Sequence, residues 1–277
     1  MSLNNRGFTH DQAGEEQRAI ADYTTVIGLA GAPVEQVAMA LYKRGNTHGR
    51  SGEAQLAIDD YTTLIGRAGA PTDVVARALL SRGSTQGQAG EREKARSDFE
   101  AVVRLPEAPL EGVVMAQLEL SELHFGDGRW NDGFEALAAS LERGEVTQPS
   151  YRGNATFLIG VVFASGLGAQ GRREKVSSLL NLYDKHHALP TLGEALIQHI
   201  GRVFRAGKPF PSTDNLDGWA VCWEAAAENV PDFRLSVRLL RAGIEFVKTG
   251  GDDPGRLLDL TSPERAILEQ AFGLETR

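Results

Sequence analysis

The chain of 277 residues has a single cysteine, Cys222, and no long hydrophobic run. One cysteine cannot form a disulfide within the chain, and a lack of disulfides is typical of the reducing cytoplasm, so we expect a cytoplasmic protein. A membrane-spanning helix needs about 18 consecutive apolar residues. The most apolar stretch, residues 155–169, is shorter and contains Gly160, Gly166 and Gly168. We therefore expect no membrane partner.

Positive charge is also scarce, since the 29 lysines and arginines are outnumbered by 37 aspartates and glutamates, which gives a formal net charge of −8. Binding to a phosphate backbone needs concentrated positive charge, so the composition predicts no nucleic-acid partner. The sequence also lacks the Gly-x-Ser-x-Gly, His-Glu-x-x-His and Walker-type motifs of common hydrolases and nucleotide-binding proteins. We predict a protein that is not an enzyme, with no catalytic residues, no cofactor and no metal ion.

One glycine motif, Gly166-Leu-Gly168-Ala-Gln-Gly171, matches the Gly-x-Gly-x-x-Gly pattern of dinucleotide-binding loops. That pattern needs a strand before it and an acidic residue about twenty positions later. Asp184 comes only thirteen positions after Gly171, and no alternation of strands and helices surrounds the motif. We interpret it as a loop between helices. An enzyme with a cofactor at this loop is the weakest of three functional hypotheses.

The most informative feature that is present is a repeat of 38 residues. A fixed period in this range is typical of stacked repeat proteins, in which each unit buries its apolar face against its neighbours. The residues that recur at this spacing are Arg6-Gly7, Arg44-Gly45 and Arg82-Gly83; Asp22-Tyr23, Asp60-Tyr61 and Asp98-Phe99; and Pro33, Pro71 and Pro109.

Within the second unit the apolar residues follow a helical period. Apolar positions 34, 37, 38, 41 and 42 form the pattern of an amphipathic helix, which predicts a helix over Val34–Arg50. After Ser51-Gly52 the pattern resumes over residues 53–66, and Gly69 and Pro71 follow as helix-ending residues. Each unit is thus predicted to be two antiparallel helices joined by a turn.

The glycine of each Arg-Gly pair falls in the middle of the first predicted helix, at Gly7, Gly45 and Gly83. A glycine there costs about 1 kcal/mol relative to alanine, so its recurrence indicates that the second helix passes too close for a side chain. We expect the alanine twelve residues later to face it, with an aromatic residue four positions further on beside that alanine. These residues are Ala19, Ala57 and Ala95, followed by Tyr23, Tyr61 and Phe99.

This arrangement resembles the tetratricopeptide repeat family, in which a small residue of the first helix is followed at these two spacings by an alanine and an aromatic residue. Three copies match, and a fourth is degenerate, with Ser121, Gly133 and Leu137 at the three places. The resemblance covers roughly residues 3–145. The family's usual period is about 34 residues, and we place the four extra residues in the linkers before the prolines.

The predicted fold is all-α: a solenoid of helical hairpins, or tetratricopeptide-like superhelix, with an irregular all-helical C-terminal part. We place about four repeats in residues 1–146, the first truncated and the fourth degenerate. Residues 147–277 are expected to be helical and either to continue or to cap the solenoid. Within them, Thr261-Ser262-Pro263-Glu264 predicts a helix start. The helices expected there span residues 151–167, 172–187, 192–206, 214–229, 233–248 and 263–272.

The first unit begins at Leu3, which aligns with Leu41, so that the counterpart of residues 34–40 is missing. A solenoid end usually carries a complete polar cap. We therefore expect the chain to be part of a longer protein with more repeats or another domain upstream, and Met-Ser-Leu to be an artificial start.

Several charged and aromatic clusters have structural interpretations. Each arginine of the Arg-Gly pairs has an aspartate sixteen residues later, which predicts an ion pair between the helices of a hairpin; the alternative is a row of arginines that binds an acidic peptide. Histidines recur at the repeat spacing, but stacked copies about 10 Å apart cannot share one metal ion. The residues interpreted as structural are His10, His48 and His124 with Gln86 between them; His186 and His187; Trp219, Cys222 and Trp223; Arg234, Arg238 and Arg241; and residues 127–131, which faintly resemble a calcium loop.

The resemblance to the family implies a ligand groove lined by the first helix of each hairpin. Transferred to the second and third units, it gives as candidate groove residues Tyr42, Asn46, Arg50, Leu80, Ser84 and Gln88. The leading functional hypothesis is a non-enzymatic scaffold that binds a protein or peptide, with self-association left open. The alternative is a sensor or regulatory arm of a larger multidomain signalling protein whose catalytic part lies upstream.

Overall fold

The chain divides into two compact units, Met1–Gly144 and Glu145–Arg277. The computed structural model describes residues 2–143, 231–248 and 260–273, together with positions 178, 180, 181, 193, 197, 198, 200–202, 204–207, 221 and 224. All regular elements in these ranges are α-helices, as predicted. The helix expected at 151–167 and most of those expected at 172–187 and 214–229 lie outside the described residues, whereas nine of the fifteen positions of the one expected at 192–206 are described.

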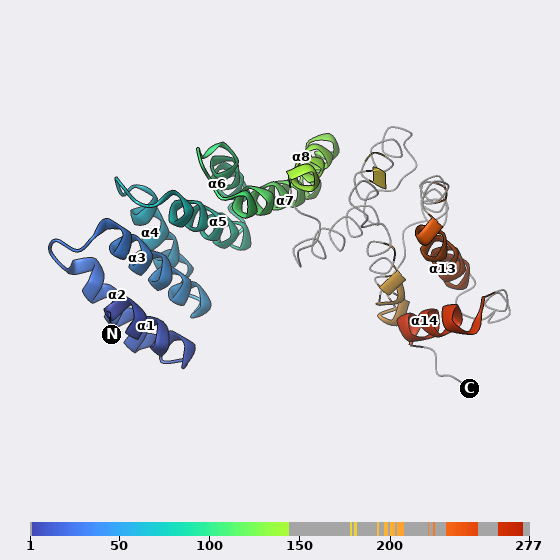
Figure 1. Cartoon of the computed structure of the whole chain (residues 1–277), viewed down its shortest axis with the longest axis horizontal. Helices are drawn as coiled ribbons and strands as arrows, with labels where there is room; N and C mark the ends of the chain where they lie inside the picture. Colours follow the sequence, from blue (N-terminus) through green and yellow to red (C-terminus); the bar gives the residue numbers. More distant parts are fainter. Residues whose placement is uncertain are drawn as a thin grey trace. The chain divides into compact units, whose positions relative to one another are not determined.

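The first unit is a row of four helical hairpins, which confirms the predicted repeat fold (Figure 1). Each helix packs against its neighbours in sequence, and the first helices of successive hairpins also contact one another. The four hairpins are α1 (Leu3–Gln12) with α2 (Glu16–Gly28), α3 (Val34–Arg50) with α4 (Ala54–Ile65), α5 (Thr72–Gln88) with α6 (Arg92–Arg104), and α7 (Leu110–Gly126) with α8 (Trp130–Arg143).

The same turn joins the two helices of every hairpin. A glycine adopts a left-handed conformation at Gly14, Gly52, Gly90 and Gly128, with φ between 73° and 81°. The N–H of the next residue then donates to the carbonyl five residues back, as from Glu53 to His48 at 2.9 Å. Because only glycine adopts this conformation without strain, the recurring glycine fixes the turn even in the degenerate fourth hairpin.

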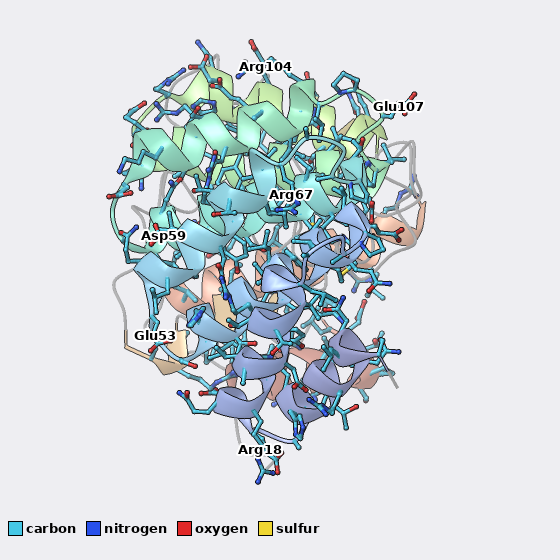
Figure 2. All side chains as sticks on the ribbon, turned by 90° about the vertical axis from the view of Figure 1, so that its left-hand side faces the viewer. Arg18, Glu53, Asp59, Arg67, Arg104 and Glu107 are labelled. Atoms are coloured by element: carbon cyan, nitrogen blue, oxygen red, sulfur yellow. The ribbon has the colours of Figure 1, made fainter. Side chains whose placement is uncertain are left out.

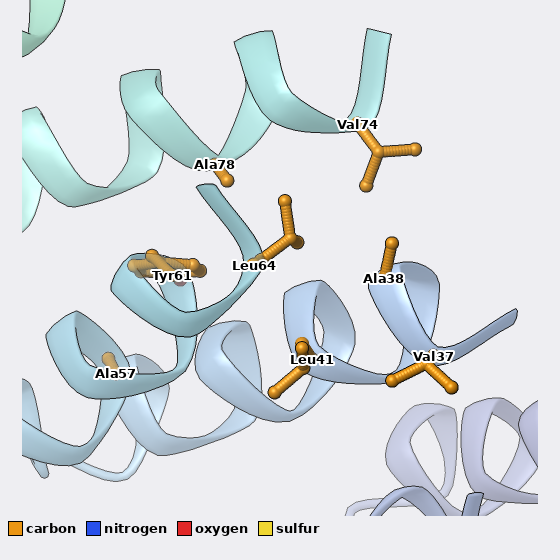
Figure 3. Packing of buried hydrophobic residues seen from close by; sticks show 8 residues of the cluster. All are labelled: Val37, Ala38, Leu41, Ala57, Tyr61, Leu64, Val74 and Ala78. Atoms are coloured by element: carbon orange, nitrogen blue, oxygen red, sulfur yellow. The ribbon is translucent and has the colours of Figure 1, made fainter. Parts of the chain in front are cut away.

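Buried aliphatic and aromatic side chains from three consecutive helices form the core of each repeat. Figure 3 shows this packing for the second hairpin, where Leu64 of α4 points toward Ala78 of α5 and Leu41 of α3 belongs to the same cluster. Tyr61, Leu64 and Leu41 are at most 2 % exposed. Each hairpin thus completes its core with the first helix of the next hairpin, as expected for a stacked repeat.

The glycine of each first helix lies against an aromatic ring of the second helix. A Cβ added to Gly45 would lie 2.6 Å from the Tyr61 ring, and the values for Gly7 against Tyr23 and Gly83 against Phe99 are 2.7 and 2.8 Å. The close approach was predicted, but the expected partner was wrong, because the conserved alanine does not face this glycine. Ala57 instead lies opposite Gly49, one helical turn further along α3.

The fourth hairpin fills the same space with a different set of residues. Phe125 occupies the place of Gly87, and Gly133, in the place of Ala95, makes room for its ring, since a Cβ on Gly133 would lie 2.6 Å from it. Ser121 replaces the helix glycine and donates to the Gly133 carbonyl at 2.8 Å. The aromatic ring is therefore carried by the first helix of this hairpin, whereas Phe99 of the third hairpin is on the second helix, and a glycine faces the ring in both cases.

The predicted ion pair within each hairpin is confirmed. Arg44 donates from Nε and Nη2 to the two carboxylate oxygens of Asp60, at 2.8 and 2.5 Å. The pairs of Arg6 with Asp22 and of Arg82 with Asp98 have the same fork geometry.

The arginines also connect successive hairpins, which the sequence did not predict. The Nη1 atom of Arg44 donates to Thr24 Oγ1 of the preceding hairpin at 2.9 Å, and Arg82 repeats this bond with Thr62. Arg6 makes no such bond among the described residues, and its side chain is 55 % exposed against 19 % for Arg44. The ion pairs are thus part of the stacking between repeats.

Charged side chains cover the outside of the helical layers. Figure 2 shows Arg18, Glu53 and Arg104 pointing away from the ribbon into solvent. Glu107 lies at the same periphery, in the linker before α7, and it is the one residue other than glycine with a positive φ (57°) in the described chain. The equivalent linker positions are Gly31 and Gly69, with φ of 75° and 77°.

In the second unit, α13 (Pro231–Lys248) packs against α14 (Ser262–Phe272). Three rings, Phe204, Phe246 and Phe272, form a cluster with centroids 5.3 to 5.5 Å apart. The predicted helix start is confirmed: the Glu264 carboxylate accepts from the backbone N–H of Thr261 at 2.7 Å and from its hydroxyl at 2.8 Å. These bonds, together with Arg238, lower the pKa of Glu264.

Arg44→Ala is expected to lower the free energy of unfolding by roughly 2 kcal/mol, because it removes two charge-assisted hydrogen bonds and leaves the buried Asp60 carboxylate unpaired. Arg6→Ala removes an equivalent but more exposed pair and should cost less. Chemical denaturation of the two variants measures the difference. Equal losses would show that the additional bond to Thr24 and the burial of Arg44 contribute nothing.

Glu107→Gly is expected to raise the free energy of unfolding by about 0.5–1 kcal/mol, because it relieves a left-handed conformation at an exposed position. The reverse change at the equivalent position, Gly69→Glu, should be destabilising by a similar amount. Thermal melts followed by circular dichroism test the pair. A stability that is unchanged in both variants would contradict the argument from backbone conformation.

Candidate functional site

A cavity of about 690 Å³ lies between α3 and α5, and we refer to it as the α3/α5 cavity. Most of its lining residues come from the C-terminal halves of these two first helices. They are Asn46, Gly49, Arg50, Gly52, Ala54, Tyr61, Ser81, Ser84, Thr85, Gln88 and Ala89.

A second cavity, of about 300 Å³, lies between α5 and α7, and we refer to it as the α5/α7 cavity. It is lined by Gly83, Ser84, Gly87, Gln88, Arg92, Phe99, Glu119, Glu122 and Leu123. Ser84 and Gln88 line both cavities, so the two adjoin at α5, and we refer to them together as the groove across α3, α5 and α7.

The two cavities occupy the same register of successive repeats. Adding 38 to Asn46, Tyr61 and Ser81 gives Ser84, Phe99 and Glu119, which line the second cavity. The stacking geometry therefore creates the groove at each step, while its chemistry is set by the residue type at each repeated position.

The equivalent positions between α1 and α3 are bridged by side chains. Asp11 accepts from Thr47 Oγ1 at 2.9 Å and pairs with Arg50. The Lys43 ammonium lies 4.6 Å from the centre of the Phe8 ring. The open part of the groove is consequently the part lined by α5 and its two neighbours.

Hydrogen bonds in the α3/α5 cavity leave several polar groups available. Tyr61 donates from its buried hydroxyl to Asn46 Oδ1 at 2.7 Å, and Thr85 bonds to the Ser81 carbonyl. Within the described part of the chain, the Asn46 amide nitrogen, the Ser84 hydroxyl and the Gln88 amide have no hydrogen-bond partner. Amides and hydroxyls of this kind can both donate to and accept from a peptide backbone.

The structure brings four of the six candidate groove residues together. Asn46, Arg50, Ser84 and Gln88 line the α3/α5 cavity. Tyr42 and Leu80 are half-buried and pack against the cores of the second and third hairpins. Arg50 lines the cavity but its guanidinium pairs with Asp11.

Among the lining residues that were missed from the sequence are Ser81, Thr85, Glu119 and Glu122. The repeat period could have found the two glutamates, because they lie 38 residues after Ser81 and Ser84. They were missed because the candidate groove was restricted to the second and third units, whereas it continues into the degenerate fourth unit.

The histidine series has the structural role that was expected. His10 and His48 contact Glu15 and Glu53 through Nδ1 at 2.5 Å, across the turn of their hairpins. The fourth copy, His124, is buried, and burial together with Arg129 lowers its pKa. No group of three metal-ligating side chains occurs among the described residues.

Residues of the other charged clusters form ion pairs. Asp127, the first acid of the segment that resembled a calcium loop, accepts from Arg92 at 2.8 Å and also pairs with Arg96. In the second unit, Arg238 pairs with Glu264 and Arg241 with Glu224. The glycine motif at 166–171, His186 and His187, and Trp219, Cys222 and Trp223 lie outside the described residues.

The hairpins α1–α8, with their glycine–aromatic contacts, resemble tetratricopeptide repeats. A tetratricopeptide repeat protein from Parabacteroides merdae ATCC 43184 has a similar structure over 97 % of this chain and 97 % of its own, with 15 % sequence identity and a TM-score of 0.49. No protein-family model matches the sequence, and no curated protein is significantly similar to it. Among the described residues, none of the helices is both long and apolar enough to cross a membrane.

The first two hairpins differ at one buried hydroxyl. Tyr61 bonds to Asn46, but Phe8 occupies the corresponding position in the first hairpin, and the Tyr23 hydroxyl has no partner in the described part of the chain. Burial raises the pKa of Tyr23 to about 12. The third hairpin has Phe99 at this place, without any hydroxyl.

We expect Tyr23→Phe to leave the free energy of unfolding unchanged or to raise it by up to about 1 kcal/mol, since it removes an unsatisfied buried polar atom. Tyr61→Phe should lower it by about 1 kcal/mol, because the hydrogen bond to Asn46 is lost. Urea denaturation of both variants makes the comparison. If Tyr23→Phe were more destabilising than Tyr61→Phe, the Tyr23 hydroxyl would have to form a stabilising hydrogen bond, contrary to this argument.

Proposed function

We propose that the chain is a non-enzymatic module that binds a protein or peptide along the groove formed by α3, α5 and α7. The observation that carries this proposal is the adjacency of the two cavities, which share Ser84 and Gln88. A ligand that lies along the groove would contact the first helices of three successive hairpins. A rounded small molecule would need only one of the cavities.

The lining of the groove supports an extended peptide as the ligand. A volume of about 690 Å³ is within the range of roughly 300–1,000 Å³ that is usual for ligand sites. The available groups of Asn46, Ser84 and Gln88 include both donors and acceptors, which suits the N–H and C=O groups of a peptide backbone. Repeat solenoids use extended surfaces of this kind for binding.

Ser84→Tyr tests the proposal, because Ser84 lines both cavities and a tyrosine there would fill the space between them. Random peptides displayed on phage are selected on the wild-type chain, and the affinity of the selected peptides is measured by fluorescence anisotropy. We expect Ser84→Tyr to weaken binding by about tenfold or more, which corresponds to about 1.4 kcal/mol.

The matched control is Ser97→Tyr, which makes the same change at an exposed position of α6 outside the groove. It should bind the selected peptides like the wild type. Peptides that bind both variants equally would place the binding surface elsewhere. A selection that enriches no peptide above a surface without protein would contradict the proposed function itself.

A further inference from the structure

We infer that the groove selects a ligand with a cationic side chain, preferably arginine, which is held by Glu119 and Glu122 in the α5/α7 cavity. This inference rests on the proposed function and adds the chemistry of the partner. It follows from the charges at repeated positions, from the pairing of the other carboxylates, and from the position of the two glutamates in the cavity.

The charge at two repeated positions of the first helices changes along the stack. The register position that is Lys43 in α3 is Ser81 in α5 and Glu119 in α7. The position three residues later is Asn46, Ser84 and Glu122 in the same three helices. Because the backbone register is the same, the α5/α7 cavity is the step of the groove where two carboxylates enter the lining.

These carboxylates, one half-buried at Glu119 and one exposed at Glu122, differ from the buried acids of the hairpins, which are paired. Asp22, Asp60 and Asp98 each bind the arginine of their hairpin. Within the described residues, Glu119 and Glu122 have no ion pair. Arg92 lines the same cavity, but its guanidinium is already bound to Asp127 and to the Leu123 carbonyl.

Two adjacent carboxylates without a cation are unfavourable in a partly enclosed site. Burial raises the pKa of Glu119, and the charge of Glu122 raises it further. A ligand cation in the cavity would stabilise both ionised groups, because opposite charges attract more strongly where water is displaced. An anionic ligand group would be repelled from the same place.

Arginine matches the cavity better than lysine. Its planar guanidinium carries five N–H donors and binds carboxylates through two parallel hydrogen bonds. Glu119 and Glu122 supply the carboxylates, and the Ser84 hydroxyl at the boundary with the α3/α5 cavity supplies a further acceptor. The neutral lining of the α3/α5 cavity would then bind the adjoining backbone of the ligand.

The test uses the peptides selected on the wild-type chain and the variant Glu119→Gln/Glu122→Gln. We expect arginine and lysine to be enriched among the selected peptides. The double variant should bind them about tenfold or more weakly, as expected for the loss of a charge-assisted hydrogen bond. Replacing the enriched cationic residue of the peptide with alanine should weaken binding to the wild type but have little further effect on the double variant.

The matched control is Glu107→Gln/Glu111→Gln, which changes the net charge equally at exposed positions that line neither cavity. It should retain wild-type affinity, and circular dichroism verifies that both double variants fold. Addition of salt should weaken binding to the wild type more than binding to Glu119→Gln/Glu122→Gln.

The result separates this inference from the proposed function. Selected peptides that are sensitive to Ser84→Tyr but not enriched in cations, or that bind Glu119→Gln/Glu122→Gln as tightly as the wild type, would overturn the inference and leave the groove as the binding site. Failure to select any peptide would overturn both.

Discussion

The close approach of the two helices in each hairpin is the constraint on which the rest of the first unit depends. The Tyr61 ring lies where a side chain on Gly45 would have to be. At this separation Arg44, the residue before that glycine, reaches both oxygens of Asp60 and also Thr24 of the preceding hairpin. Two adjacent residues thus determine how a hairpin closes and how it stacks, which explains why Arg-Gly is the most regular sign of the repeat.

The fourth hairpin shows that the constraint is a ring packed against a glycine, and that either helix can carry the ring. Phe125 of α7 lies against Gly133 of α8, whereas Phe99 of α6 lies against Gly83 of α5, and both pairs of helices pack together. The turn glycine is retained, with Gly128 at a φ of 73°. Because packing requires only that facing volumes be complementary, the residues on the groove side of α7 can differ from those of α5 without loss of the register.

The sequence predicted those features that depend on periodicity and missed those that depend on the register between the two helices of a hairpin. The bounds of α3 and the arginine–aspartate pairs follow from spacing, and they are confirmed. The partner of Gly45 was wrong because the antiparallel register places Tyr61 opposite Gly45 and Ala57 opposite Gly49, one turn away. Whether a side chain on a first helix packs against the core or lines the cavity also cannot be read from the sequence pattern. Tyr42 and Leu80 lie on the first helices as predicted, but they pack against the cores, whereas Asn46 and Ser84 reach the cavity.

The spacing of the stacked helices also limits what could lie in the groove. Packed helices are roughly 8–10 Å apart, so equivalent positions such as Ser81 and Glu119 recur at about that distance along the stack. An extended peptide advances about 3.3 Å per residue, and a polyproline II segment has three residues per turn with a rise of about 3.1 Å. Side chains about three residues apart in such a segment would therefore face successive cavities on the same side. A helical ligand rises only about 1.5 Å per residue and would need six or seven residues for the same step, with its backbone groups already bonded internally. The available amides and hydroxyls of the α3/α5 cavity thus suit an extended ligand, because only its backbone groups remain free to bind them.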